Sequence, residues 1–103
     1  MHIVILVSSC SKKEAQKISV SLIKAKLAAC VNIVDKVDSV FFWEHKVQKA
    51  KEFLLIIKST KAKFIQITKL IKSLHRYKVP EIIGLPIIVG DHSYLRWIDA
   101  ALR

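Results

Sequence analysis

The sequence predicts an α+β fold with the element order β-α-β-β-α-β and one additional helix at the C-terminus. Two observations predict it. Short apolar runs rich in β-branched residues are separated by two segments in which apolar residues recur every three or four positions. A polar reversal at 44–46 also joins two long extended segments into a hairpin. This order is that of a ferredoxin-like βαββαβ sandwich.

The first half of the chain supplies a strand, a helix and an extended region. Residues 3–7 are all apolar, which is typical of a strand buried on both faces. Helical periodicity runs from about 12 to 27. Its inward stripe comprises Ala15, Ile18, Leu22 and Ile23. Two extended pieces follow at 30–33 and 37–43.

The second half repeats this alternation, with a returning strand at 47–59, a helix at 61–75 and a strand at 82–89. Pro86 places that last strand at an edge or a bulge, because proline cannot donate to a ladder. Asp91 is the expected N-cap of the final helix. The residues expected to face inward from these two helices are Phe64, Ile67, Leu70, Ile71, Leu74, Leu95, Ile98 and Leu102.

The returning strand is apolar on both faces over 53–57, and the outgoing strand is strongly apolar over 40–43. In a two-layer domain the sheet face without helices should be polar. An apolar second face indicates burial against another subunit. We therefore expect the apolar faces of 40–43 and 53–57 to form an inner surface between subunits, with the 37–59 hairpin and the 82–89 strand extending sheets across subunit boundaries.

Length and composition indicate one domain over residues 1–103. No apolar run reaches the roughly 18 residues of a membrane helix. The N-terminus also has no basic region before its apolar stretch, so we expect an unprocessed cytoplasmic protein without a membrane partner. Cys10 and Cys30 have neither zinc-finger nor disulfide-framework spacing.

The formal net charge is +10, from eighteen Lys and Arg against eight Asp and Glu. The basic residues follow the polar faces of the two predicted helices without interleaved aromatic residues. They are Lys13, Lys17, Lys24, Lys61, Lys69, Lys72 and Arg76. A solvated helix surface is the preferred interpretation, and no specific nucleic acid is expected. The alternative is a nonspecific attraction for polyanions that salt would screen.

Five segments carry a resemblance that extends from about residue 3 to the C-terminus. They are LAACVNI at 27–33, FFWEHKV at 41–47, KST at 58–60, HRYKVPEIIGLPI at 75–87 and GDHSYLRWI at 90–98. In order and spacing they resemble the CutA family of small trimeric proteins linked to divalent-cation tolerance. The resemblance implies a homotrimeric binding module connected with Cu²⁺ or another divalent cation.

The resemblance also implies a cleft between subunits, lined by Trp43, His75, Tyr77 and Glu81. A carboxylate beside an imidazole has three possible roles. The pair can act as acid and base, it can ligate a metal, or its hydrogen bonds can simply hold the trimer together.

Copper binding in bacterial members is associated with a cysteine on the first strand and a His-His pair. In the register set by LAAC, Val7 takes the cysteine position, and Leu74 and His75 take the pair. Only His75 remains, and one imidazole is a weak metal site. Cys10 is the other candidate metal ligand, because it precedes a helix N-terminus that would favour its thiolate. Cys30 is expected to be a buried, inert thiol.

Two departures from the family pattern stand out. WEGK becomes WEHK, which places His45 in a turn where the usual glycine suggests positive φ. HPY becomes HRY, which adds the charge of Arg76 beside His75. No phosphate loop, nucleophile elbow or HExxH motif is present, so we do not expect an enzyme. The alternatives to metal tolerance are a PII-like sensor of a small anion, or a purely structural trimeric scaffold.

Overall fold

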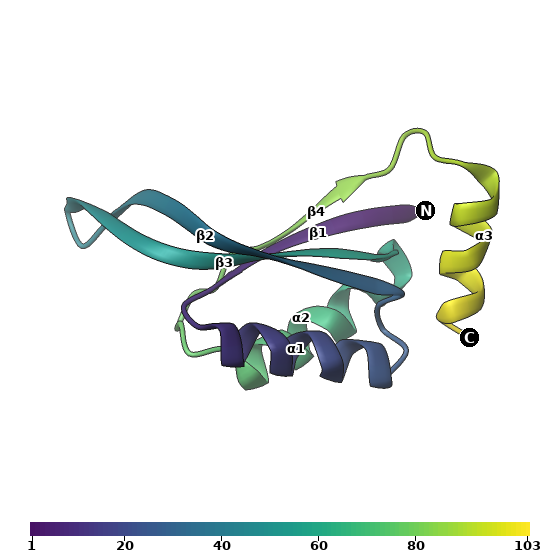
Figure 1. Cartoon of the computed structure of the whole chain (residues 1–103), viewed down its shortest axis with the longest axis horizontal. Coiled ribbons are helices and arrows are strands. Elements are labelled where there is room, and N and C mark those ends of the chain that lie inside the picture. The colour runs from purple at the N-terminus through teal and green to yellow at the C-terminus, as the bar shows by residue number, and fades with distance from the viewer.

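The computed structural model describes every residue from Met1 to Arg103. Its elements confirm the predicted order and the α+β class (Figure 1). They are β1 (His2–Ser9), α1 (Lys12–Lys24), β2 (Cys30–Trp43), β3 (Lys46–Thr60), a 3₁₀ turn (Lys61–Lys63), α2 (Phe64–Leu74), β4 (Ile82–Pro86) and α3 (His92–Ala101).

The four strands form one antiparallel sheet in the order β2-β3-β1-β4. Helices α1 and α2 cover one face, and α3 lies at the end of the sheet next to the N-terminus (Figure 1). Asp99 Oδ1 of α3 lies 2.9 Å from His2 Nε2 of β1, which ties this helix to the sheet. Pro86 lies in an edge strand, β4, as predicted.

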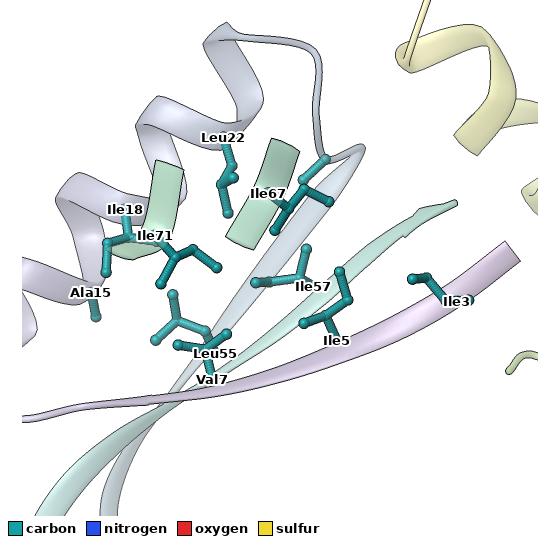
Figure 2. Close-up of a cluster of buried hydrophobic side chains, with 11 residues drawn as sticks. Ile3, Ile5, Val7, Ala15, Ile18, Leu22, Leu55, Ile57, Ile67 and Ile71 are labelled. Carbon is teal, nitrogen blue, oxygen red and sulfur yellow. The ribbon is translucent and has the colours of Figure 1, made fainter. Parts of the chain in front are cut away.

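The core lies between the sheet and the α1–α2 layer. Alternate residues of β1 and β3 point toward the helices, and their side chains meet those of α1 and α2 (Figure 2). Ile5, Ile18, Leu55 and Ile67 are each completely buried. Burying one such side chain stabilises the fold by about 1.5 to 3 kcal/mol. Ile23, expected on the inward stripe of α1, is instead 41% exposed.

The opposite face of the sheet is also apolar, and no helix covers most of it (Figure 1). By strand alternation and register it carries Val4, Leu6, Val34, Leu54, Ile56, Ile83 and Leu85. The run 53–57 was predicted to be apolar on both faces of its strand, and the structure confirms this. Leu55 and Ile57 belong to the core, so only Leu54 and Ile56 remain on the open face.

Strands β2 and β3 continue past the body of the molecule as a long hairpin arm (Figure 1). The two extended pieces predicted at 30–33 and 37–43 are one strand, β2, interrupted by a bulge between Val34 and Val37. Lys36 in this bulge has a φ of 57°. At the tip, Glu44 and His45 have φ of 51° and 64°, the type I′ conformation that matches the twist of hairpins.

Two elements, α1 and β4, end about three residues earlier than predicted. Helix α1 stops at Lys24 rather than near 27, because Lys26 adopts a φ of 57°. Leu27 N then donates to Leu22 O at 3.0 Å, closing a Schellman motif. Strand β4 ends at Pro86 rather than at 89, and Pro86 has no N–H to donate to the ladder. Ile87 N makes one further bond, to His2 O at 3.0 Å.

Candidate functional site

The residues predicted to line a cleft fall into two groups within the chain. The rings of His75 and Tyr77, in the segment after α2, have centroids 4.9 Å apart. Trp43 lies near the tip of the hairpin arm and is 46% exposed. Glu81 is exposed just before β4. The chain therefore pairs His75 with Tyr77, and neither of them makes a hydrogen bond or ion pair with Trp43 or Glu81.

The side chain of His75 is completely buried and both of its ring nitrogens are hydrogen-bonded. Nδ1 accepts from the backbone N–H of Tyr77 at 3.0 Å, because an amide nitrogen can only donate. Nε2 therefore carries the proton and donates it to the backbone oxygen of Ser8 at 2.6 Å. This is a neutral imidazole that holds the segment after α2 against the end of β1.

Glu14 completes this anchorage, and sequence reasoning missed it. Its Oε1 accepts from Ser9 Oγ at 2.6 Å, and its Oε2 accepts from Arg76 N at 2.8 Å. The side chain is only 8% exposed. Ser11 caps α1 by accepting from Glu14 N, so the spacing is that of a capping box. In a capping box the glutamate would return to the cap residue, whereas this carboxylate binds β1 and the segment after α2.

Tyr77 reaches in the other direction. Its hydroxyl donates to Glu52 Oε2 of β3 at 2.7 Å, and Glu52 is 6% exposed. Burial raises the pKa of Tyr77 above its ordinary value, and the hydrogen bond to the Glu52 carboxylate raises it further. Five side chains thus form a buried polar network, the His75 cluster, which comprises Ser9, Glu14, Glu52, His75 and Tyr77.

The His75 cluster has no free lone pair on its imidazole. A metal ion at His75 would have to replace one of the two ring hydrogen bonds. No group of three or more His, Cys, Asp and Glu side chains is arranged to hold a metal ion within the chain. Val7 is completely buried in the core, and Leu74 packs against that core. Neither residue can therefore supply the sulfur and nitrogen ligands of the bacterial copper site.

The two cysteines lie in different surroundings. Cys10 is partly exposed, and its charge when ionised would act on the hydroxyl of Tyr77. Cys30, expected to be buried, is also partly exposed and lies 3.9 Å from Lys58 Nζ. Burial raises the pKa of Tyr94, and the charge of Cys30 and a hydrogen bond with it add to the rise.

A family model described as "CutA1 divalent ion tolerance protein" matches residues 3–101. The chain belongs to the CutA1 family. Among its relatives, the divalent-cation tolerance protein CutA of Archaeoglobus fulgidus is 40% identical over 103 residues and is covered completely, as is this chain. That of Thermus thermophilus is 40% identical over 98 residues, which are 95% of each chain.

Other CutA relatives are longer. The chloroplastic protein CutA 1 of rice is 44% identical over 101 residues, which are 98% of this chain and 57% of the rice protein. The chain thus spans little more than half the length of the two plant relatives, since it also covers 56% of chloroplastic CutA of Arabidopsis thaliana.

Solved CutA structures confirm the fold. The Archaeoglobus structure, described as a periplasmic divalent cation tolerance protein, superposes with a TM-score of 0.97 over 100% of both chains at 39% identity. Rice CutA1 superposes with a TM-score of 0.95 at 43% identity, over 99% of this chain and 94% of the rice chain. No helix of this chain is long and apolar enough to cross a membrane.

Proposed function

We propose that this CutA chain acts in divalent-cation tolerance as a non-enzymatic binding module whose ligand sites lie in clefts between the subunits of a homotrimer. The observation that carries the proposal is the apolar surface that one subunit leaves uncovered. It comprises the open face of the sheet and the exposed apolar residues of the hairpin arm, which include Phe42 at 70% and Val47 at 67%. Exposed surfaces of this kind mark interfaces.

A trimer also explains why the predicted site is divided. The hairpin arm holds Trp43 away from the body of its own subunit, where His75, Tyr77 and Glu81 follow one another (Figure 1). An arm that reaches a neighbouring subunit would bring Trp43 to the neighbour's Tyr77 and Glu81. In this arrangement the His75 cluster is the support that fixes the segment 76–81, and exposed Glu81 with Trp43 of the adjoining arm faces the ligand.

Direct binding of Cu²⁺ is a more specific proposal than a role in divalent-cation tolerance. His75 and Cys10 are its proposed donors, with Glu81 as a carboxylate nearby in sequence. The subunit alone supplies too few donors for a stable Cu²⁺ site, so the completed site would be shared between subunits.

Calorimetric titration of the full chain with Cu²⁺ tests this role. We expect saturable binding of about one ion per subunit that Cys10→Ser weakens at least tenfold, as loss of a ligand does. Cys30→Ser is the matched control and should bind as the parent does. His75→Ala tests the buried donor, with circular dichroism to verify its fold. Absence of saturable binding, or an equal loss in Cys30→Ser, would contradict direct Cu²⁺ binding.

One feature favours the second candidate, a PII-like sensor of a small anion. A shallow hollow of about 240 Å³ lies between α2 and the segment before β4. Its polar lining is Thr68, Lys72 and Lys78, and Thr68 Oγ1 is buried without a hydrogen-bond partner. In a thermal-shift series, stabilisation by phosphate or a carboxylate but not by Cu²⁺ would favour this function. Lys72→Ala should abolish that stabilisation.

The cytoplasmic location stays a prediction. The names of relatives point to different places, since the plant proteins are chloroplastic and the Archaeoglobus structure is described as periplasmic. Fractionation of the source cells, with detection of the full chain, tests it directly.

A further inference from the structure

The net charge of the chain is confined to one layer of the fold. The segments 12–26 and 61–78, which contain α1 and α2, hold eleven of the eighteen basic residues and only one of the eight acidic residues, Glu14. Seven basic and seven acidic residues lie elsewhere. The formal charge of +10 is therefore the charge of this helix layer, and the rest of the chain is neutral.

The outer surface of this layer carries no exposed carboxylate. Helices α1 and α2 lie side by side on one face of the sheet, so their outward residues form one continuous surface (Figure 1). The Glu14 carboxylate turns inward to Ser9 and Arg76 N. Among the eleven basic side chains only Lys12 has an Asp or Glu partner, Asp35, at 3.8 Å, and Lys26 Nζ donates to the backbone oxygen of Arg103 at 2.6 Å. Like charges repel, so this surface gains most from a partner that brings many negative charges at once.

Aliphatic side chains lie exposed among these lysines. Along α1, Lys13, Lys17, Val20 and Lys24 follow one helical stripe, and Val20 is 51% exposed. Ile65 on α2 is 70% exposed and shares its outward face with Lys69 and Lys72. Val79, also 70% exposed, lines the same hollow as Lys72 and Lys78. Thus both helices present cations and aliphatic groups together.

The mixture of lysines and aliphatic side chains on this surface fits some anionic partners better than others. Single-stranded nucleic acids bind through aromatic stacking, and base edges are read mainly by Arg, Asn and Gln. Here ten of the eleven cations are lysine, and Tyr77, the aromatic residue closest in sequence to Arg76, is bonded inward to Glu52. A duplex backbone would use the lysines and leave the aliphatic residues without a role. A phospholipid surface uses both, since lysines reach the headgroups while aliphatic groups enter the acyl boundary.

We propose that the α1–α2 surface is a peripheral docking surface for bilayers rich in anionic phospholipid. The lysines supply long-range attraction to the phosphate layer, and Val20, Ile23, Ile65 and Val79 supply shallow insertion. Docking of this kind lies in the plane of the interface and needs no spanning helix. The open sheet face points away from this surface, so the proposal is independent of the proposed trimer and of metal binding.

Vesicle co-sedimentation of the full chain tests the proposal. We expect binding to vesicles that contain roughly a third phosphatidylglycerol, none to pure phosphatidylcholine, and loss of binding by about 0.5 M salt. Each lysine near such a surface contributes about fivefold in affinity, so Lys17→Glu with Lys69→Glu should weaken binding at least about 25-fold. Lys36→Glu with Arg96→Glu makes the same change in net charge outside the helix layer and should bind as the parent does.

The insertion step has its own pair of variants. Val20→Ser with Ile65→Ser should weaken vesicle binding severalfold and leave binding to duplex DNA unchanged. Ile88→Ser with Val89→Ser alters two aliphatic residues that are 88% and 85% exposed outside the layer, and should affect neither. The proposal is overturned by absent vesicle binding at low salt, by equal losses in the two charge-reversal variants, or by tighter binding to duplex DNA than to vesicles at the same salt.

Discussion

His75 shows how a residue in a functional motif can serve the fold. Its imidazole is buried, neutral and bonded at both nitrogens, and the carboxylate of Glu14 secures the next residue through Arg76 N. Together they join the segment after α2 to β1 and α1, which lie more than 60 residues earlier in the sequence. They hold the start of the segment that follows, so in the proposed function their role is to keep Tyr77 and Glu81 in place.

Tyr77→Phe should lower the free energy of unfolding at neutral pH by about 2 kcal/mol, because the buried Glu52 carboxylate loses its hydroxyl donor. Tyr77 has a raised pKa in the folded state. The unfolded chain therefore releases that proton first, and the stability of the parent protein falls as pH rises above about 10. In Tyr77→Phe this contribution to the fall is absent. Urea unfolding across this range measures both effects.

A spectroscopic control isolates the same group. The chain has two tyrosines, so tyrosinate absorbance in Tyr94→Phe reports Tyr77 alone. We expect its ionisation well above the usual tyrosine pKa. An ordinary titration curve for that variant would show that the bond between Tyr77 and Glu52 does not form in solution.

At this scale the sequence placed some residues correctly. Asp91 caps α3 by accepting from Tyr94 N, as predicted from its position before a helical pattern. Glu14 was missed because a helix-starting S-x-x-E has a local explanation, the capping box, which needs no distant partner. The contact to Arg76 N spans 62 residues, and no local pattern encodes it.

At the scale of elements, the hairpin arm depends on its tip. The register of β2 against β3 is continuous from Val37 to Trp43, and the type I′ turn sets the twist of both strands. Positive φ at His45 was predicted from the glycine that the family pattern has there, and the structure confirms it with φ of 64°. Glu44 shares that conformation. The two-residue turn between β2 and β3 is therefore formed by two residues that lack the conformational freedom of glycine.

His45→Gly should increase the free energy of unfolding by about 0.5 to 1 kcal/mol, because it removes the steric cost of a left-handed conformation at little entropic expense. His45→Ala retains that cost and should give no increase. Urea unfolding of the two variants makes the comparison. Equal stabilities would show that the turn relaxes away from positive φ in solution.

The lengths of elements were harder to predict than their order. Helix α1 ends early because Lys26 adopts a left-handed conformation. A glycine at this position would have predicted the helix end from the sequence, whereas a lysine does not. Strand β2 continues through its bulge because β3 pairs with it on both sides. Both outcomes depend on contacts with other elements. Helix α2, in contrast, could be predicted from the period of its apolar residues alone.

For the whole molecule, the proposed assembly depends on the open sheet face. Its apolar character was predicted from the double-sided pattern of 53–57, but the division of that run between core and open face needed the register with β1. Leu55 and Ile57 turn to the helices, while Leu54 and Ile56 turn away. The trimer proposed for CutA rests on this second set.

Ile56→Glu should convert the assembly into monomers, because a carboxylate would be buried in the subunit interface without a partner. Light scattering of the parent should give three times the 11.7 kDa of one chain, and that of the variant should give the mass of one chain. Ile65→Glu, on the helix layer, is the control and should remain trimeric. A monomeric parent, or a trimeric Ile56→Glu, would contradict the proposed assembly.

The bulge in β2 has a consequence for how this protein can change over time. Two residues, Asp35 and Lys36, lie opposite a single residue of β3. The alternation of side chains between the two sheet faces therefore shifts by one residue at the bulge. As a result Phe41 and Trp43 lie on the same face as Val34 and not on that of Ile33. Deleting one of the two would restore the original parity and turn every later side chain of the arm to the opposite face. The body of the fold would be unaffected. Loss of a single codon at this position would thus change which aromatic side chains lie on each face of the arm. One deletion would then alter the contacts on which the proposed assembly depends.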